Sequence, residues 1–332
     1  MTAPVTAVVP TKNRIDLLDA TLRSILAQRD VDVYVVIVDD GSDLPVAERI
    51  RTLASPRVRV LRNEASRGVS AARNQGVEAA QTPWVAFCDD DDLWTPSKIA
   101  GQLQAAQVSD AVWAYTGAVK FEYGPVVWQL QPPPSPQQVV ERLASKCVVP
   151  AGASNVIASR RAVLDVGGFD EGLMHLADWD MWLRLLEAGQ PATAEGIGVA
   201  YRLHPGTMSL NPAGILEELQ VLDQRWRHLR GGAALDPGPT HTWIAMSHLR
   251  AGRRVQAAMS YLRASRTMPR HGLKGAVRTL HPAPPSPAHR VKEEGDASKR
   301  PALKRVQHVQ LPAEVHELLR ELASSPVPGR KV

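Results

Sequence analysis

The chain has 332 residues, of which 44% are hydrophobic and 22% charged, a composition typical of a globular protein with one large core or two domains. No stretch approaches the roughly 18 uninterrupted apolar residues of a membrane-spanning helix, and residues 1–5 lack the features of a signal peptide. We therefore expect a cytoplasmic protein. Its two cysteines, Cys88 and Cys147, exclude a disulfide framework, and we expect both thiols to be inert.

Charge is distributed unevenly along the chain. Residues 253–332 hold 16 Lys and Arg against 6 Asp and Glu, a net charge of +10, whereas residues 1–252 carry a net charge of −5. A basic C-terminal region either keeps a protein in solution or favours an anionic surface such as the inner face of a membrane. Both roles stay open here, and we expect no nucleic acid partner.

The first 88 residues alternate between strand and helix patterns. Four segments have the β-branched or apolar composition of strands, and two have the apolar or small-residue spacing of helices. In chain order they are a strand at residues 3–10, a helix at 17–26, strands at 31–38 and 57–61, a helix at 66–81 and a strand at 85–88. This alternation predicts an α/β fold built on a mostly parallel sheet.

Polar residues follow three of these strands at the point where each strand ends. They lie at residues 11–14, at Asp39 and Asp40, and in the run of four aspartates at residues 89–92. Parallel sheets bind ligands at the carboxyl ends of their strands. Four adjacent carboxylates favour a hard divalent cation such as Mg²⁺ or Mn²⁺, which proteins commonly share with substrate phosphates. The alternative for the acidic run alone is a solvated turn.

The order and spacing of these and later motifs resemble a family 2 glycosyltransferase of the GT-A fold, in which a Rossmann-like, mostly parallel sheet carries flanking helices. The likeness extends over roughly residues 3–210. The matching segments are residues 8–14, 36–42, 72–76 with Asn63 and Gly68, 87–94, 167–171 and 178–184.

The resemblance implies a donor site for a nucleotide-diphosphate sugar. Pro10, Thr11 and Arg14 would border the base and ribose, and Asp39 would accept the ring N–H of the base. Arg73 would contact the diphosphate or brace the first aspartate of the acidic run, since a guanidinium pairs well with phosphate.

The four aspartates receive different roles from the same resemblance. Asp91 would bind the metal directly, and Asp89 would contact the ribose or a metal-bound water. The family pattern here is Asp, any residue, Asp, so Asp90 occupies the variable middle position between Asp89 and Asp91. Asp90 also counts among the donor-binding residues. Asp92 would cap the helix that begins near residue 96 or hold the arginine of the diphosphate site. Further along, His204 would reach the metal or the diphosphate.

The acceptor side of the resemblance centres on Asp178. Inversion at a sugar carbon requires a base on the face opposite the leaving nucleotide, and Asp178 matches the family's general base. The family usually has Glu before this Asp, where this chain has Ala177. This departure leaves open how the acceptor is contacted and how the pKa of the base is adjusted. We expect Asp180 to cap a helix at residues 181–186. The proline-rich residues 132–136 predict a rigid loop at the acceptor mouth.

We expect four segments: a catalytic domain at residues 1–210, a helical extension at 211–281, a disordered linker at 282–304 and a tail at 305–332 with a short amphipathic helix near 309–322. The basic C-terminal region would contact a membrane that holds lipid-linked acceptors.

The function that fits best is inverting, metal-assisted, hexosyltransferase-like transfer from a nucleotide sugar, UDP-linked by preference, to a hydroxyl of a cell-surface glycan or lipid-linked precursor. Two alternatives stay open: a lapsed enzyme that binds nucleotide sugars or glycans, and a nucleotidyltransferase.

Overall fold

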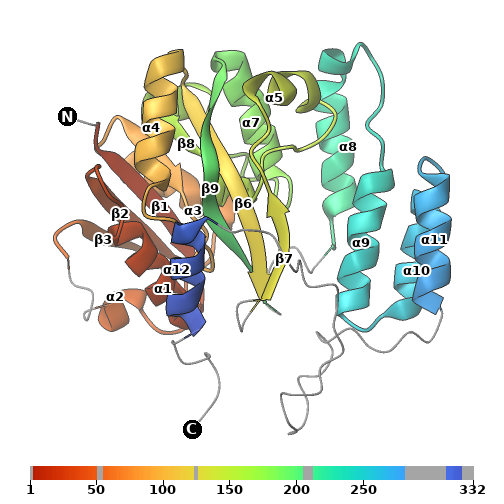
Figure 1. Ribbon diagram of the computed structural model, residues 1–332, viewed down its shortest axis with the longest axis horizontal. Coiled ribbons are helices and arrows are strands. Elements are labelled where there is room, and N and C mark those ends of the chain that lie inside the picture. The colour runs from red at the N-terminus through yellow and green to blue at the C-terminus, as the bar shows by residue number, and fades with distance from the viewer. Residues whose placement is uncertain (1–2, 51–54, 123–125, 205–211, 281–311, 324–332) are drawn as a thin grey trace, which may run out of the picture. The chain divides into compact units, whose positions relative to one another are not determined.

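The structure is a computed structural model that describes residues 3–50, 55–122, 126–204, 212–280 and 312–323 (Figure 1). The chain divides into two compact units. The first combines Met1–Leu203 with His308–Val332, and the second is His204–Gln307. The segment 282–304, for which we expect disorder, lies outside the described residues. None of the described helices is both long and apolar enough to cross a bilayer.

The first unit is built on one mixed sheet. Its strands are β1 (Val5–Thr11), β2 (Val33–Asp40), β3 (Val58–Asn63), β4 (Trp84–Phe87), β5 (Leu93–Trp94), β6 (Trp113–Glu122), β7 (Val126–Gln131), β8 (Ile157–Ser159) and β9 (Pro191–Leu203). The order across the sheet is β3-β2-β1-β4-β8-β6-β9-β5, and β7 pairs with β6. Strands β3, β2, β1 and β4 run parallel, as predicted, whereas β8 is antiparallel to both of its neighbours.

Helices cover both faces of this sheet. Within the described residues they are α1 (Ile15–Leu26), α2 (Val46–Arg49), α3 (Val69–Ala79), α4 (Lys98–Ser109), α5 (Pro136–Arg142), α6 (Arg160–Asp165), α7 (Ala177–Ala188) and α12 (Ala313–Ala323). Helix α7 begins four residues before the predicted one. Asp180 therefore does not cap it but lies in its first turn, where its carboxylate accepts a hydrogen bond from Arg184.

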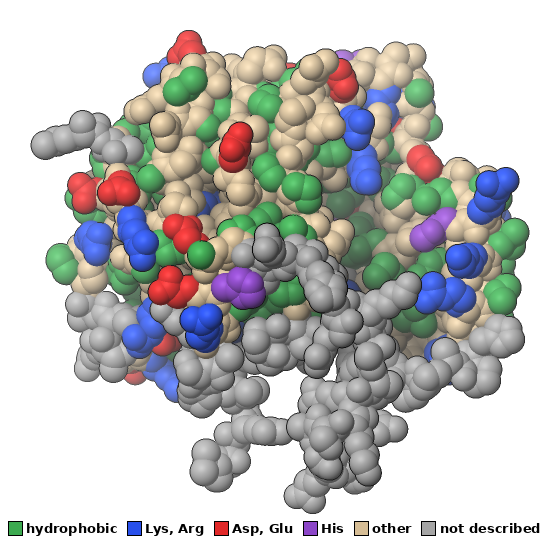
Figure 2. Space-filling view, viewed as in Figure 1, with side chains coloured by type: hydrophobic (Ala, Val, Ile, Leu, Met, Phe, Trp, Pro, Cys, Tyr) green, Lys and Arg blue, Asp and Glu red, His purple; other side chains and the backbone are tan. Residues whose placement is uncertain are grey.

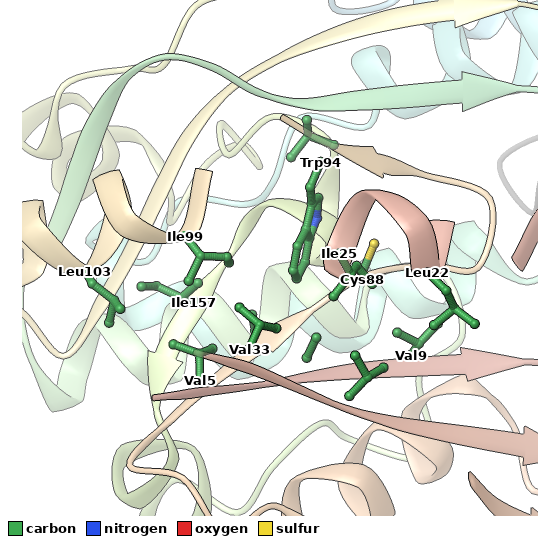
Figure 3. Packing of buried hydrophobic residues seen from close by; sticks show 14 of the residues in the cluster. Val5, Val9, Leu22, Ile25, Val33, Cys88, Trp94, Ile99, Leu103 and Ile157 are labelled. Carbon is green, nitrogen blue, oxygen red and sulfur yellow. The ribbon is translucent and has the colours of Figure 1, made fainter. Parts of the chain in front are cut away.

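One face of the sheet packs against α1 and α4. Alternate side chains of β1 point to this face because successive residues of a strand face opposite sides. The side chains drawn in Figure 3 include Val5, Val9, Leu22, Ile25, Ile99 and Leu103. Cys88 lies in this core, and burial raises the pKa of its thiol well above the ordinary value, which fits the expectation of an inert cysteine.

The opposite face brings α3 and α7 to the strands that lead to the acidic run. Gly76 of α3 lies directly against the side chain of Val8, so a larger residue would push the helix off β1. The Phe87 ring at the end of β4 meets the Phe169 ring edge to face, with centroids 4.9 Å apart, and Trp182 of α7 lies 6.1 Å from Phe169. These aromatic contacts hold α7 close to the end of β4.

Helix α12 completes the first unit. Val315 and Leu319 pack with Leu93 of β5 and Phe121 of β6, and the Ser97 hydroxyl donates a 2.6 Å hydrogen bond to Glu314. Helix α12 lies within the tail in which we expect a short amphipathic helix, and its apolar side covers strands that follow the acidic run.

The second unit is helical in its described part. It contains α8 (Ile215–Trp226), a short 3₁₀ helix (Arg227–Arg230), α9 (Gly238–Arg250), α10 (Arg254–Ala264) and α11 (Pro269–Leu280). These helices correspond to the predicted extension at residues 211–281.

Candidate active site

The three polar segments predicted to share one edge of the sheet do meet there. Thr11 pairs with Asp39 in the register of β1 and β2, and β4 lies on the other side of β1. The Thr11 hydroxyl donates a 2.6 Å hydrogen bond to Asp90, and Arg14 lies 3.1 Å from carboxylate oxygens of both Asp90 and Asp91. The first loop thus contacts the acidic run across the edge.

Helix α1 fixes the backbone of the acidic run through a row of polar side chains. The Thr21 hydroxyl lies 3.0 Å from the carbonyl oxygen of Asp90 and 2.8 Å from that of Asp92, so the two carbonyls share its single O–H as a bifurcated hydrogen bond. Ser24, one turn further along, and Gln28, just beyond the end of the helix, bind the backbone that follows the acids. Thr21 and Ser24 are buried, so these bonds hold the loop where water does not compete. The apolar spacing of α1 gave no sign of this polar row.

The aspartates of the run face different partners. Asp89 forms a 2.5 Å ion pair with Arg73, as the resemblance suggested for that arginine. Asp92 is fully buried and accepts a hydrogen bond from the backbone N–H of Arg202, so it neither caps α4 nor holds Arg73. Among the described residues its second oxygen, Oδ2, has no hydrogen-bond partner.

The arrangement of the carboxylates suits a divalent cation. One oxygen from each of Asp89, Asp91 and Asp92 lies within 4.8 Å of the others. Burial, and then the neighbouring carboxylates, raise the pKa of Asp92 well above its ordinary value and that of Asp90 to about 7. A buried oxygen without a donor and carboxylates that disfavour one another's charge are the features that a bound Mg²⁺ or Mn²⁺ resolves, so these residues fit such an ion.

The end of β2 is occupied by internal hydrogen bonds. Asp39 is fully buried, and its carboxylate accepts from the backbone N–H groups of Ser42 and Val46 and from Arg62 at 2.5 Å. These bonds outweigh burial, so the pKa of Asp39 is lowered. Asp40 ties β2 to the loop before α3, where it accepts from side chains and from two backbone N–H groups. Pro10 is buried in β1 beside this edge.

Asp178 lies in the first turn of α7 and is half-buried. Burial raises the pKa of its carboxyl group, and the nearby Arg73 guanidinium partly opposes that rise. The same Arg73 guanidinium that is paired with Asp89 therefore lies near enough to Asp178 for its charge to favour the ionised carboxylate. Its guanidinium also lies 5.2 Å from the centroid of the Phe169 ring.

Glycines and an asparagine position the loops around Asp178. A Cβ added at Gly152 would lie 2.5 Å from Asp178 Oδ2, so glycine allows this close approach of backbone and carboxylate. Asn74 of α3 exchanges two hydrogen bonds with the backbone of Phe169, which fixes the glycine-rich loop before α7. Asn74 belongs to the matching segment at residues 72–76, and its role is to hold this loop in position.

A cavity of about 340 Å³ opens next to the segment that leads to Gly152. Three hydrogen bonds support its surroundings: Tyr115 to the Pro134 carbonyl, Asn155 to the Pro150 carbonyl, and Trp179 of α7 to the Leu143 carbonyl. It is lined by Gln131, Pro132, Pro133, Pro134, Gln138, Lys146, Cys147, Val148 and Pro150. The predicted proline-rich loop thus forms one wall.

The remaining predicted residue, His204, directly follows β9 and is the first residue of the second unit. It is not among the three side chains gathered into the acidic cluster of the described residues.

Comparison with known proteins identifies the family. The family model described as "Glycosyl transferase family 2" matches residues 6–166. Two uncharacterized glycosyltransferases, from Haemophilus influenzae and from Bacillus subtilis (YwdF), are each 30% identical over 54% of this chain, which covers 61% and 67% of their lengths. The chain belongs to glycosyltransferase family 2. This glycosyltransferase family member is also 24% identical, over 62% of its length and 80% of the relative's, to the Escherichia coli "UDP-Glc:alpha-D-GlcNAc-diphosphoundecaprenol beta-1,3-glucosyltransferase WfaP".

Solved structures agree with the family 2 assignment at the level of the fold. The structure of "S. aureus TarS 1-349 in complex with UDP-GlcNAc" superposes with a TM-score of 0.55 at 15% identity and covers 83% of this chain and 89% of TarS 1-349. The predicted GT-A fold with C-terminal helices is thereby confirmed.

Proposed function

We propose that this glycosyltransferase is an inverting, metal-dependent enzyme that transfers a sugar from a nucleotide-diphosphate donor to a hydroxyl of a glycan or lipid-linked precursor. One observation carries the proposal: Arg73 is paired with Asp89 of the acidic cluster, and its charge also acts on the half-buried Asp178, so two separate carboxylate sites lie around one guanidinium. One site suits the leaving diphosphate, and the other suits proton removal from the acceptor.

The donor side lies at the shared strand edge. Pro10, Thr11, Arg14 and Asp39 border the nucleoside, with Asp89, Asp90 and Arg73 toward the ribose and diphosphate. A UDP-sugar is the favoured donor, supported by the UDP-Glc donor of the WfaP relative and by the UDP-GlcNAc bound to TarS. Arg62 Nη1 forms a 2.5 Å ion pair with Asp39 Oδ2. Recognition of the base by the Asp39 carboxylate therefore involves displacement of this guanidinium.

Asp91, with Asp89 and Asp92 beside it, would hold Mg²⁺ or Mn²⁺, and His204 is a further candidate ligand. Such an ion supplies positive charge that stabilises the leaving diphosphate. Arg73 adds a planar guanidinium with paired donors for phosphate oxygens. Arg14 holds Asp90 and Asp91 in place, and Thr21 fixes the backbone that carries them.

On the acceptor side, Asp178 takes the proton of the attacking hydroxyl. Its raised pKa makes the carboxylate a stronger base than an ordinary aspartate, provided that it is ionised. The cavity beside residues 146–150 is the proposed place for part of the acceptor. A lipid-linked or polysaccharide precursor is supported by two relatives: the acceptor of WfaP is a sugar on diphosphoundecaprenol, and the Rhizobium meliloti protein ExoO takes part in succinoglycan biosynthesis. A cytoplasmic location, with membrane contact through the basic C-terminal region, agrees with such an acceptor.

A panel of nucleotide sugars tests the donor and the activity together. With Mn²⁺ present, the cognate UDP-sugar is expected to raise Tm, because a ligand that binds only the folded state stabilises it. Donor hydrolysis measured in the same samples then separates an enzyme from a lapsed binding protein, the reading that Ala177 motivates. Stabilisation without any turnover would favour the binding protein, and no stabilisation by any nucleotide sugar would contradict the donor site.

Gly152→Ala tests whether the close contact with Asp178 matters for transfer. The added methyl group would displace the carboxylate, and displacement of a catalytic group by about 1 Å costs on the order of 10²-fold in rate. We expect transfer to fall by about that factor while donor affinity is retained. Gly167→Ala is the matched control, because Gly167 also has a positive φ, of 85°, but no atom lies within 4 Å of the added Cβ. Equal transfer rates in the two variants would contradict the prediction.

A further inference from the structure

Helices α10 and α11 form a closely packed antiparallel pair. A Cβ added at Gly272 would lie 2.5 Å from the carbonyl oxygen of Tyr261, and one added at Gly275 would overlap the Tyr261 ring. Residues 265–268 join the two helices, and this short connection requires them to run in opposite directions. The two glycines therefore allow α11 to lie directly against α10.

Each of these helices exposes an apolar stripe with the spacing i, i+4, i+7. Large apolar side chains at such spacing usually face a core, but here about half or more of each side chain surface is open to solvent. The exposed fractions are 64% for Val255, 49% for Met259, 49% for Leu262, 52% for Leu273, 56% for Val277 and 64% for Leu280.

The two stripes lie on the same side of the pair. Leu262 follows Tyr261 and Leu273 follows Gly272, so each stripe is rotated by about 100°, in the same sense, from the surface where the helices meet. Because the helices run in opposite directions, the same rotation brings both stripes to one side. Together they form a single apolar face, which we call the α10–α11 face.

The charge around this face has one sign. Residues 237–280 contain eight Lys and Arg and no Asp or Glu. Arg263 lies one turn from Met259, and Arg270 and Lys274 lie on the exposed side of α11 next to its stripe. Figure 2 shows Lys and Arg side chains among hydrophobic ones over this part of the second unit.

We propose that the α10–α11 face docks on an anionic membrane surface. The apolar stripes enter the boundary between headgroups and acyl chains, and the surrounding Arg and Lys side chains pair with lipid phosphates. The basic character of the C-terminal region then acts through a folded helical pair and not through the segment that follows residue 280.

The exposed apolar stripes favour lipid over nucleic acid. A nucleic acid would neutralise the same cations but would leave the six large apolar side chains in water. Single-stranded nucleic acid is bound through exposed aromatic rings, whereas the stripes contain only Val, Leu and Met, and the Tyr261 ring is buried between the helices.

Co-sedimentation of the full-length chain with lipid vesicles tests the proposal. We expect binding to vesicles of phosphatidylcholine with phosphatidylglycerol, weaker binding in high salt, and little binding to phosphatidylcholine alone. The stripe variant is Leu262→Gln, Leu273→Gln and Val277→Gln, and the charge variant is Arg263→Gln, Arg270→Gln and Lys274→Gln. Each is expected to weaken binding at least about tenfold.

Matched controls place the same changes on the first unit. They are Val108→Gln, Leu164→Gln and Met174→Gln for the apolar set, and Arg23→Gln, Arg59→Gln and Arg161→Gln for the charged set, all at exposed positions. We expect both controls to bind as the wild type, and circular dichroism must show that all variants are folded.

Two results would overturn the proposal: equal binding by the stripe variant and its control, or binding of an oligonucleotide but not of vesicles. Sedimentation needs no catalysis, so each of these results leaves the proposed transfer reaction untouched.

Discussion

Replacement of Asp178 by Asn is expected to lower the rate of sugar transfer by about 10³-fold while the affinity for the nucleotide sugar stays within a small factor of the wild type. The amide has nearly the same shape as the carboxylate but does not accept the acceptor's proton, and a positioned general base contributes about 10²–10⁴-fold. Steady-state kinetics and donor titration by calorimetry measure the two effects separately.

The pH dependence of the transfer rate provides a second test of Asp178. Burial raises the pKa of Asp178, and only the ionised form acts as a base. The wild-type rate should therefore fall as pH drops through that raised pKa. This decrease on the acid side of the pH–rate profile should occur at a higher pH than the pKa of an exposed aspartate would give. Asp165→Asn, at an exposed position of α6, is the control, and it should keep the wild-type rate and the wild-type pH–rate profile. Robust transfer by the Asp178→Asn protein would remove Asp178 from its role.

Replacement of Asp91 by Ala is expected to abolish metal-dependent transfer, with a loss on the order of 10³-fold. The change removes one of three carboxylate oxygens that lie within 4.8 Å of one another, and metal stabilisation of a leaving group is worth several kcal/mol. Titration of the transfer rate with Mn²⁺, after treatment of the protein with a chelator, measures the effect, and calorimetry measures the affinity for the ion directly.

The control for this variant is Asp43→Ala, at an exposed position beyond β2. It should respond to Mn²⁺ as the wild type does. The metal role of Asp91 would fail if Asp91→Ala bound Mn²⁺ with unchanged affinity, or if chelator treatment of the wild type left transfer intact.

Much of the fold could be predicted because its pattern is local. The β-branched run at residues 3–10 and the apolar run at 31–38 fix the first two strands, and the parallel arrangement follows from the helix between them. Helix ends were less accurate. The predicted start of α7 at residue 181 was late by four residues, because Asp180 is a residue type that favours helix caps but here lies inside the first turn.

The site was predicted in outline and not in its contacts. That Thr11, Asp39 and the acidic run share one edge follows from parallel strands. The partner of each carboxylate does not, because it depends on side chains far away in the sequence. Asp92 meets the backbone of Arg202, 110 positions later, and Arg62 binds Asp39 from the neighbouring strand.

The sequence by itself determined which residues reach the edge of the sheet and that four carboxylates gather there, since strand periodicity and chain order are local properties. Only the tertiary structure decided how those carboxylates differ: Arg73 pairs with Asp89 and influences Asp178, and Gly152 lies against Asp178. It also decided that α12 packs on strands of the first unit and that the apolar stripes of α10 and α11 share one side. The physical reason is that close packing and strand register select partners across distances in sequence that no local pattern records.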